Sequence, residues 1–161
     1  MTGGGSSLPE VQRLLAVLAA GKRCAETGSA FGEGALAIAS TAASLVTVES
    51  DPERAAVARE RLRQASNVEL LVGDWRELLP QRGPFELLFF DAGRLAEFPD
   101  AIDLLAPGGL LVKDDLTPVR AVDGGAVREL LFRDPRLLAV EVLTTPTTAA
   151  VIAARRTSGP R

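Results

Sequence analysis

The stretch Glu26-Thr27-Gly28-Ser29-Ala30-Phe31-Gly32 decides the fold of this chain. It follows the short strand candidate Arg23–Glu26 and leads into an alanine-rich segment that begins at Gly34. A strand, a glycine turn and a helix in this order are typical of an α/β unit whose turn lies against a ligand. Gly28 allows a tight turn and a close approach to the backbone, while Gly32 and Gly34 allow close packing at the helix start.

Strand and helix patterns alternate along the rest of the chain. Helices are predicted over Leu8–Ala20, Gly34–Ala43, residues 51–64, Trp75–Leu79, Leu95–Leu105 and Val122–Phe132. Strands are predicted over Arg23–Glu26, Leu45–Val48, Val68–Val72, Phe85–Phe90, Leu110–Lys113, Leu137–Leu143 and Ala149–Ala154. This alternation indicates a mostly parallel sheet with helices on both faces. The last two strands are separated only by the stretch Thr144 to Thr148, too short for a parallel crossover, so they pair antiparallel.

The fold class predicted is therefore α/β, a Rossmann-like seven-stranded, mostly parallel sheet with a C-terminal antiparallel hairpin. We expect a single domain over residues 8–154, between a flexible leader, residues 1–7, and a flexible tail, residues 155–161. No apolar run approaches the ~18 residues of a membrane span. Charges of both signs are interspersed and the net charge is −3, so neither a membrane nor a nucleic acid is an expected partner.

The absence of two residue types restricts the chemical mechanisms open to this chain. The chain contains no histidine and no tyrosine, which excludes mechanisms that need an imidazole or a phenol. Cys24 is the only cysteine, as suits a protein of the reducing cytoplasm. About 20 residues after the glycine turn, the second strand ends in Glu49, which is placed to accept hydrogen bonds from ribose hydroxyls.

The glycine turn resembles the cofactor loops of two families. Thr27-Gly28-xxx-Gly32-x-Gly34 looks like the glycine pattern of short-chain dehydrogenases, which bind a nicotinamide dinucleotide. Glu26-x-Gly28-xxx-Gly32 resembles the first motif of class I S-adenosylmethionine (SAM)-dependent methyltransferases, in particular their catechol O-methyltransferase-like branch. The spacing of the glycines does not separate these two families.

Other features favour the methyltransferase. The dehydrogenases use a tyrosine, which this chain lacks, and they are appreciably longer. The antiparallel hairpin at the end is the one expected of the methyltransferase sheet. A pyrophosphate would be repelled by Glu26, whereas the sulfonium and ammonium of SAM would be attracted to it.

The resemblance implies which residues contact the cofactor and the acceptor. Asp74 would accept a hydrogen bond from the adenine amine and Trp75 would pack on the adenine ring, although Asp74 equally suits a helix cap and Trp75 a packing role. Asp91 follows a buried strand at the ligand edge, where this class has its fourth motif. The implied cofactor residues are Glu26, Gly28, Ser29, Gly32, Glu49, Asp74, Trp75 and Asp91.

Three carboxylates come from two neighbouring strand ends. Phe90-Asp91 and Val112-Lys113-Asp114-Asp115 match the metal-binding positions of the catechol-type O-methyltransferases. Oxygen ligands of this kind suit Mg²⁺ or Ca²⁺, and such a metal would bind the substrate oxygens and lower the pKa of the reacting hydroxyl. The alternative is that Asp114 and Asp115 only cap the loop after the strand.

The resemblance weakens at the catalytic centre. Where the family commonly has a lysine acting as base, three residues after Asp91, this chain has Arg94, which can steady an anionic oxygen but does not abstract a proton. The longer N-terminal helices of the family are reduced to Leu8–Ala20. The acceptor pocket is therefore open, completed by the second subunit of a homodimer, or no longer functional.

The resulting hypothesis is a SAM-dependent O-methyltransferase acting on a small molecule, with Asp91 and Arg94 as catalytic candidates. Two alternatives stay open, an NAD(P)-binding reductase-like domain and a non-catalytic cofactor-binding protein.

Overall fold

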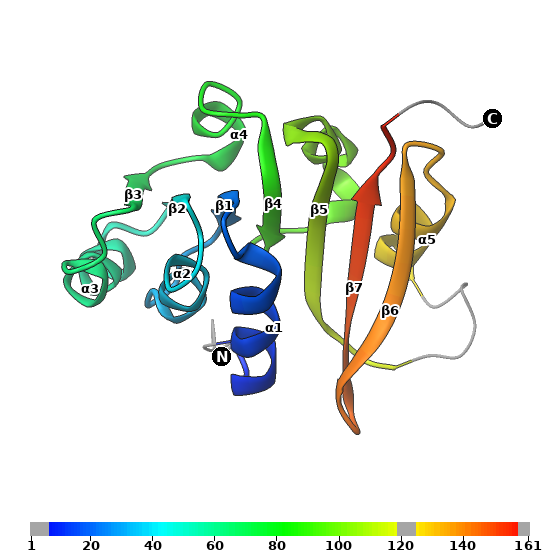
Figure 1. The fold of residues 1–161 in the computed structure, drawn as a ribbon, viewed down its shortest axis with the longest axis horizontal. Helices are drawn as coiled ribbons and strands as arrows, with labels where there is room; N and C mark the ends of the chain where they lie inside the picture. Colours follow the sequence, from blue (N-terminus) through cyan, green and yellow to red (C-terminus); the bar gives the residue numbers. More distant parts are fainter. Residues whose placement is uncertain (1–6, 119–124, 158–161) are drawn as a thin grey trace.

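The computed structural model describes residues 7–118 and 125–157, and its framework is one seven-stranded sheet (Figure 1). The strands are β1 (Arg23–Thr27), β2 (Ser44–Glu49), β3 (Val68–Val72), β4 (Phe85–Phe90), β5 (Leu105–Leu116), β6 (Leu137–Thr145) and β7 (Thr148–Arg155). Their order across the sheet is β3-β2-β1-β4-β5-β7-β6. The first five strands pair in parallel, which confirms the predicted fold class.

The C-terminal hairpin is antiparallel, as predicted from its short connection. β7 pairs antiparallel with β6 and also inserts between β6 and β5. The hairpin turn is tighter than the sequence suggests, because β6 runs to Thr145 and β7 begins at Thr148. β7 ends at Arg155, one residue beyond the predicted end of the domain.

Helices cover both faces of the sheet. The α-helices are α1 (Pro9–Ala19), α2 (Glu33–Ala39), α3 (Pro52–Leu62), α4 (Trp75–Leu78) and α5 (Ala126–Arg133), and two 3₁₀ helices are η1 (Leu95–Glu97) and η2 (Pro99–Leu104). Alternate residues of each strand point to opposite faces, so Leu87 and Phe89 pack with α1 and α2, whereas Leu88 and Phe90 pack with the 3₁₀ helices and α5. None of the described helices is long and apolar enough to span a membrane.

The prediction of one helix over Leu95–Leu105 is wrong. Two short 3₁₀ helices take its place, and they are separated at Phe98, whose backbone is not helical (φ −131°, ψ 63°). Pro99 explains the break, because a proline disfavours the helical conformation of the residue before it. β5 then begins at Leu105, whereas the sequence pattern places a break up to Gly109.

Helix ends also differ from prediction. α2 ends at Ala39 and not at the predicted Ala43. The N–H of Ser40, the residue after the helix, donates to the Leu36 carbonyl and closes the last turn. α5 begins at Ala126 in the structure, and the predicted start at Val122 lies outside the described residues. The predicted leader and tail lie for the most part outside the described residues too, while Ser7, at the end of the leader, is buried.

Candidate functional site

The glycine turn joins β1 to α2 and lies against the loop that follows β4. Gly28 has φ 81°, and its N–H donates to the Val48 carbonyl at 2.7 Å. A Cβ atom at Gly28 would lie 2.3 Å from Cβ of Ala92, so only glycine fits. Gly32, at φ 86°, is the residue before α2, and a Cβ there would lie 3.1 Å from Cα of Ala58 in α3. Gly28 therefore shapes the ligand side of the turn, and Gly32 packs two helices together.

Four strands end around a cavity of about 550 Å³ beside this turn. Its walls come from the carboxyl ends of β1, β2, β3 and β4, where parallel α/β sheets bind ligands. The lining residues are Gly28, Val48, Glu49, Ser50, Gly73, Asp74, Trp75, Arg76, Ala92, Gly93 and Phe98. The structure thus brings four of the predicted cofactor residues to one cavity, namely Gly28, Glu49, Asp74 and Trp75.

Glu49 is buried at the end of β2 and holds the glycine turn in place. Its Oε2 accepts a hydrogen bond from the backbone N–H of Ala30 at 2.8 Å, and its Oε1 accepts one from Asp51 N–H at 2.9 Å. Ala30 has φ 45°, an unusual value for a residue with a side chain, and this hydrogen bond helps to maintain it. Each carboxylate oxygen accepts more than one hydrogen bond, so Glu49 can still bind a ligand at the cavity wall.

Asp74 and Trp75 lie at the start of α4, where Asp74 is the N-cap residue and Trp75 the first helical residue, and both line the cavity. Asp74 caps this helix, accepting from Arg76 N–H at 2.9 Å and forming an ion pair with the Arg76 guanidinium, which lowers the pKa of Asp74. Trp75 packs edge-on against Phe90 and Phe98, with ring centroids 5.2 Å and 5.8 Å apart. Both local roles foreseen as alternatives are therefore present, and both residues still line the cavity.

Arg76 and Phe98 are site residues that the sequence analysis missed. The Arg76 guanidinium lies 4.9 Å from the centroid of the Phe98 ring, and both residues line the cavity. The acid-aromatic-base run at 74–76 would have been a signal for Arg76. Phe98 had no such signal, because it was assigned to the interior of a helix that does not form.

Glu26, in contrast, lies behind the cavity wall. It is buried, and a Cβ atom at Gly34 would lie 2.6 Å from its Oε1. Thr47 Oγ1 donates to Glu26 Oε2 at 2.5 Å, and Ser29 Oγ lies 2.5 Å from the same Thr47 hydroxyl. Thr47 is a further residue that the sequence analysis missed. A polar threonine between Val46 and Val48 in a buried strand would have been the signal for it.

The protonation of Glu26 changes one of the electrostatic arguments. Burial raises the pKa of Glu26 to about 8, despite the hydrogen bond from Thr47 that lowers it, and the charges of Asp91 and Asp114 add to the increase. The side chain is therefore mostly neutral at pH 7. The charge at Glu26, used above to prefer SAM over a dinucleotide, does not separate the two in the ligand-free protein.

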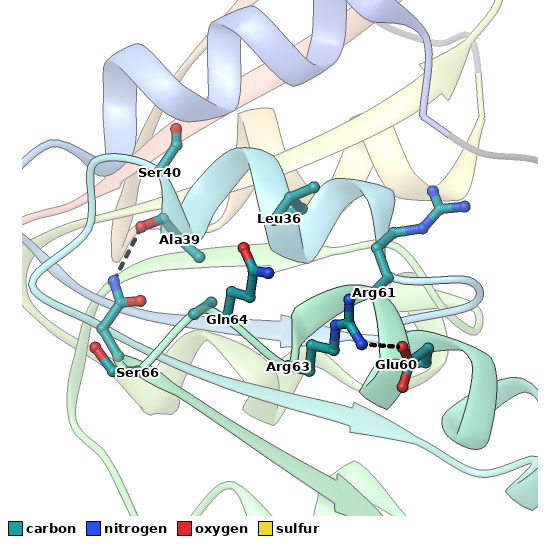
Figure 2. Close-up of a pocket in the computed structure, with 10 residues that line it drawn as sticks. Leu36, Ala39, Ser40, Glu60, Arg61, Arg63, Gln64 and Ser66 are labelled. Carbon is teal, nitrogen blue, oxygen red and sulfur yellow. Dashed lines mark hydrogen bonds and ion pairs between the residues drawn. The ribbon is translucent and has the colours of Figure 1, made fainter.

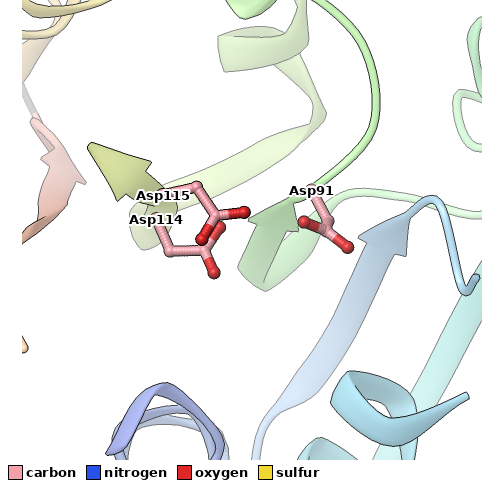
Figure 3. A group of neighbouring side chains, drawn as sticks. All are labelled: Asp91, Asp114 and Asp115. Carbon is pink, nitrogen blue, oxygen red and sulfur yellow. The ribbon is translucent and has the colours of Figure 1, made fainter. Parts of the chain in front are cut away.

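Three carboxylates meet at the ends of β4 and β5, next to the cavity. Figure 3 shows Asp91 at the end of β4 facing Asp114 and Asp115 from β5, and one carboxylate oxygen from each lies within 4.8 Å of the other two. The pairing of β5 with β7 is irregular between Lys113 and Leu116, and Asp115 has φ 57°. This irregularity interrupts the alternation of the strand, and both consecutive acids approach Asp91.

Asp114 is the most deeply buried of the three acids. Its residue is 1% exposed, and neither carboxylate oxygen accepts a hydrogen bond from the described residues. Burial raises the pKa of Asp114 to about 6, and the negative charge of Asp115 adds to this increase. Burial also raises the pKa of Asp91 to about 7, with a smaller contribution from the charge of Asp114. A buried carboxylate that accepts no hydrogen bond is costly in a folded protein, and the three acids together could hold a cation.

Arg94 does not join this group in the structure. It precedes η1, its side chain is 83% exposed, and its guanidinium pairs with Glu97 at 2.9 Å. Ser29, Gly32, Glu26 and Asp91 are not among the residues that line the cavity, although Asp91 directly precedes the lining residue Ala92.

A larger cavity, about 690 Å³, lies between α2 and α3 at the other end of the strands (Figure 2). It is an open groove lined by residues such as Leu36, Gln64 and Ser66. Its charged groups are engaged with partners, since Arg63 pairs with Glu60 at 2.9 Å and Arg61 with Glu33 at 2.5 Å. Size therefore does not identify the site, and the convergence of strand ends does.

Comparison with known proteins agrees with the fold. A family model described as "Methyltransferase domain" matches residues 25–116, which include the glycine turn and all three clustered acids. The chain belongs to this methyltransferase family.

Individual relatives are similar over part of their length. The catechol O-methyltransferase of Niastella koreensis is 33% identical over 118 residues, covering 65% of this chain and 53% of the relative. A protein-L-isoaspartate O-methyltransferase of Rhodopseudomonas palustris is 31% identical over 121 residues, covering 74% of this chain and 52% of the relative. The chain thus spans about half the length of the curated relatives it matches.

A solved structure shares the whole architecture. The O-methyltransferase from Bacillus cereus, determined in complex with SAH, superposes with a TM-score of 0.75 and covers 95% of this chain and 84% of its own. At 22% identity this similarity shows a common fold.

Proposed function

We propose that the chain is a SAM-dependent methyltransferase that transfers a methyl group to an oxygen of a small molecule. The observation that carries the proposal is the cavity at the carboxyl ends of β1 to β4, with the three-carboxylate group beside it. A nucleoside site next to an oxygen-rich acceptor site is what such a transfer requires. The SAH bound to the similar Bacillus cereus O-methyltransferase supports this choice of cofactor.

The cofactor would lie across the carboxyl ends of the strands. Glu49 would accept hydrogen bonds from the ribose hydroxyls, and Trp75 with Phe98 would supply an aromatic wall for the adenine. Asp74 would accept from the adenine amine with its remaining lone pairs. The backbone at Gly28, which lines the cavity, would contact the amino-acid half of SAM, with Glu26 and Ser29 holding the turn from behind.

The transfer itself is an in-line displacement, in which the acceptor oxygen attacks the methyl carbon of the sulfonium. Such a reaction depends mainly on holding the two reactants close and aligned. Asp91 lies next to the cavity-lining residues Ala92 and Gly93 and would orient the acceptor oxygen. Arg94 would have to leave Glu97 and turn inward to contact an anionic acceptor.

The acidic group fits a divalent cation such as Mg²⁺. Asp91, Asp114 and Asp115 would hold it, and the two unsatisfied buried oxygens of Asp114 are the observation that favours it. When bound, such an ion supplies a positive charge that makes an acceptor hydroxyl more acidic.

Calorimetry and thermal unfolding with S-adenosylhomocysteine (SAH) test the cofactor. We expect saturating SAH, at about 100 times its Kd, to raise the Tm by roughly 5 to 10 °C, and NADH to leave it unchanged. Glu49→Gln should weaken SAH binding about tenfold or more, because the ribose loses a charged acceptor. Glu53→Gln, an exposed acid in α3 that does not line the cavity, is the matched control.

These experiments distinguish a methyltransferase from a reductase-like domain and from a non-catalytic cofactor-binding protein. A Tm increase with NADH alone would support the reductase-like alternative and overturn our proposal. SAH binding without methyl transfer to a panel of catechols, phenols and carboxylic acids, with and without Mg²⁺, would identify a non-catalytic cofactor-binding protein. A cytoplasmic site of action is part of the proposal, since a thiol such as that of Cys24 stays reduced there.

A homodimer formed through β6 is also part of the proposal. β6 is an edge strand of nine residues, and Leu138 and Val140 on it are 64% and 54% exposed. A long apolar edge is a template for pairing with another strand, and β6 of a second copy has the same pattern. The other edge, β3, has only five residues, and its Glu69 pairs with Arg82.

Sedimentation velocity tests this pairing. Val140→Lys should convert a dimer to a monomer, because an added charge opposes strand pairing at an edge. Val57→Lys places the same charge at an exposed valine of α3, far from β6, and should leave the dimer intact. A wild-type protein that sediments as a monomer at high concentration would refute the homodimer.

A further inference from the structure

Lys113 places a positive charge inside the acidic group. Its Nζ lies 3.9 Å from Asp114 Oδ1, and its side chain is only 12% exposed, so the ammonium is held near the carboxylates. It lies close enough to Asp91 to lower the pKa of that acid as well. The acidic group therefore consists of three carboxylates and one ammonium, and not of three carboxylates alone.

The ammonium is held by the backbone and not by the carboxylate. Lys113 Nζ donates a hydrogen bond to the backbone carbonyl of Asp114 at 3.1 Å. The two carboxylate oxygens of Asp114 accept no hydrogen bond from the described residues. Lys113 thus contributes charge to the site while leaving the carboxylate oxygens open to another cation.

A second cation in this group would be repelled by the first. Asp114 and most of Lys113 are shielded from water, where the repulsion between like charges is screened less than at the surface. A divalent ion would experience twice the repulsion of a monovalent one at the same place. The ammonium of Lys113 would therefore partly cancel the attraction of the three carboxylates for a divalent ion.

We propose that Lys113 is a resident counterion of the Asp91–Asp114–Asp115 group and sets a low affinity of that group for divalent cations. The inference rests on the metal site of the proposed function, but it does not depend on SAM binding or on methyl transfer. Its consequence is that the charge of the acidic group is partly compensated by the chain itself when no metal is bound.

The test is a titration of the purified chain with Mg²⁺ by calorimetry at constant pH and ionic strength. We expect Lys113→Met to bind Mg²⁺ at least tenfold more tightly than the wild type. Lys113→Arg keeps the charge and should stay within about threefold of the wild type. Lys22→Met removes the only other lysine, which precedes β1 at the opposite end of the sheet, and should have no effect.

A double variant locates the effect. Adding Asp114→Asn to Lys113→Met should abolish the gain in Mg²⁺ affinity. Thermal unfolding of each variant without metal controls for folding, and a purely structural role for Lys113 would lower the Tm of Lys113→Met without tightening Mg²⁺ binding.

Each result decides the inference. Tighter binding by Lys113→Met, including binding where the wild type shows none, supports it. Equal or weaker binding by Lys113→Met, or no Mg²⁺ binding by either protein, overturns it. SAH titrated into the same samples reports separately on the proposed function, so failure of the metal experiment and failure of the cofactor proposal are distinguishable.

Discussion

Replacing Gly28 with alanine is expected to destabilise the protein by about 2 to 4 kcal/mol and to weaken SAH binding at least 100-fold. Two costs add at this position. An alanine at φ 81° is strained by about 1 kcal/mol or more, and its Cβ would lie 2.3 Å from Cβ of Ala92, which adds an overpacking cost of about 1 to 3 kcal/mol. Relief of this clash would move the loop that lines the cavity, so binding should suffer with stability.

Gly21 provides the matched control. It has φ 70°, and a Cβ there would meet no atom within 4 Å, so Gly21→Ala carries the strain without the clash. Urea unfolding should give a loss of about 1 kcal/mol for Gly21→Ala, and calorimetry should give an unchanged Kd for SAH. Equal losses of stability in the two variants would show that Ala92 yields easily, and that Gly28 is not required for close approach.

Replacing Glu26 with glutamine is expected to remove a pH dependence of stability on the order of 5 kcal/mol. The pKa of Glu26 is about 8 in the folded protein and 4.5 in its ordinary, solvated state. Below pH 4.5 Glu26 is protonated in both the folded and the unfolded state, so its ionisation does not reduce the free energy of unfolding. Between pH 4.5 and 8 the unfolded chain ionises while the folded chain holds the proton, so the stability contributed by Glu26 is lost as the pH rises through this window.

Urea unfolding at pH 5, 6.5 and 8 measures the effect. A glutamine is neutral throughout, and its amide oxygen can accept the Thr47 hydrogen bond, so Glu26→Gln should become more stable relative to the wild type at each higher pH. Glu86→Gln, at an exposed position of β4, controls for exchanging a carboxylate for an amide. A difference between Glu26→Gln and wild type that does not grow with pH would show that Glu26 is ionised in the folded protein.

Local patterns predicted most of the fold, and the exceptions have identifiable causes. The parallel strands and the hairpin follow from hydrophobic runs and from the length of connections, which are properties of neighbouring residues. The predicted helix Leu95–Leu105 was wrong because Pro99 interrupts it. The start of β5 at Leu105 was missed because Pro107 and Gly109 are poor strand residues. Leu105 pairs with Phe85, the register then shifts, and pairing with β4 resumes at Leu110, with Gly108 at φ 78° in between.

The sequence by itself determined where the candidate site lies, whereas the tertiary structure decided what its groups can do. Strand ends, the glycine turn and the acids after β4 and β5 are readable along the chain, since each is set by local turn and strand chemistry. Burial, which makes Glu26 mostly neutral at pH 7 and leaves the Asp114 carboxylate without a hydrogen bond, depends on distant elements packing around them. The same is true of Lys113, whose charge acts on Asp91 only because the fold sets β5 beside β4.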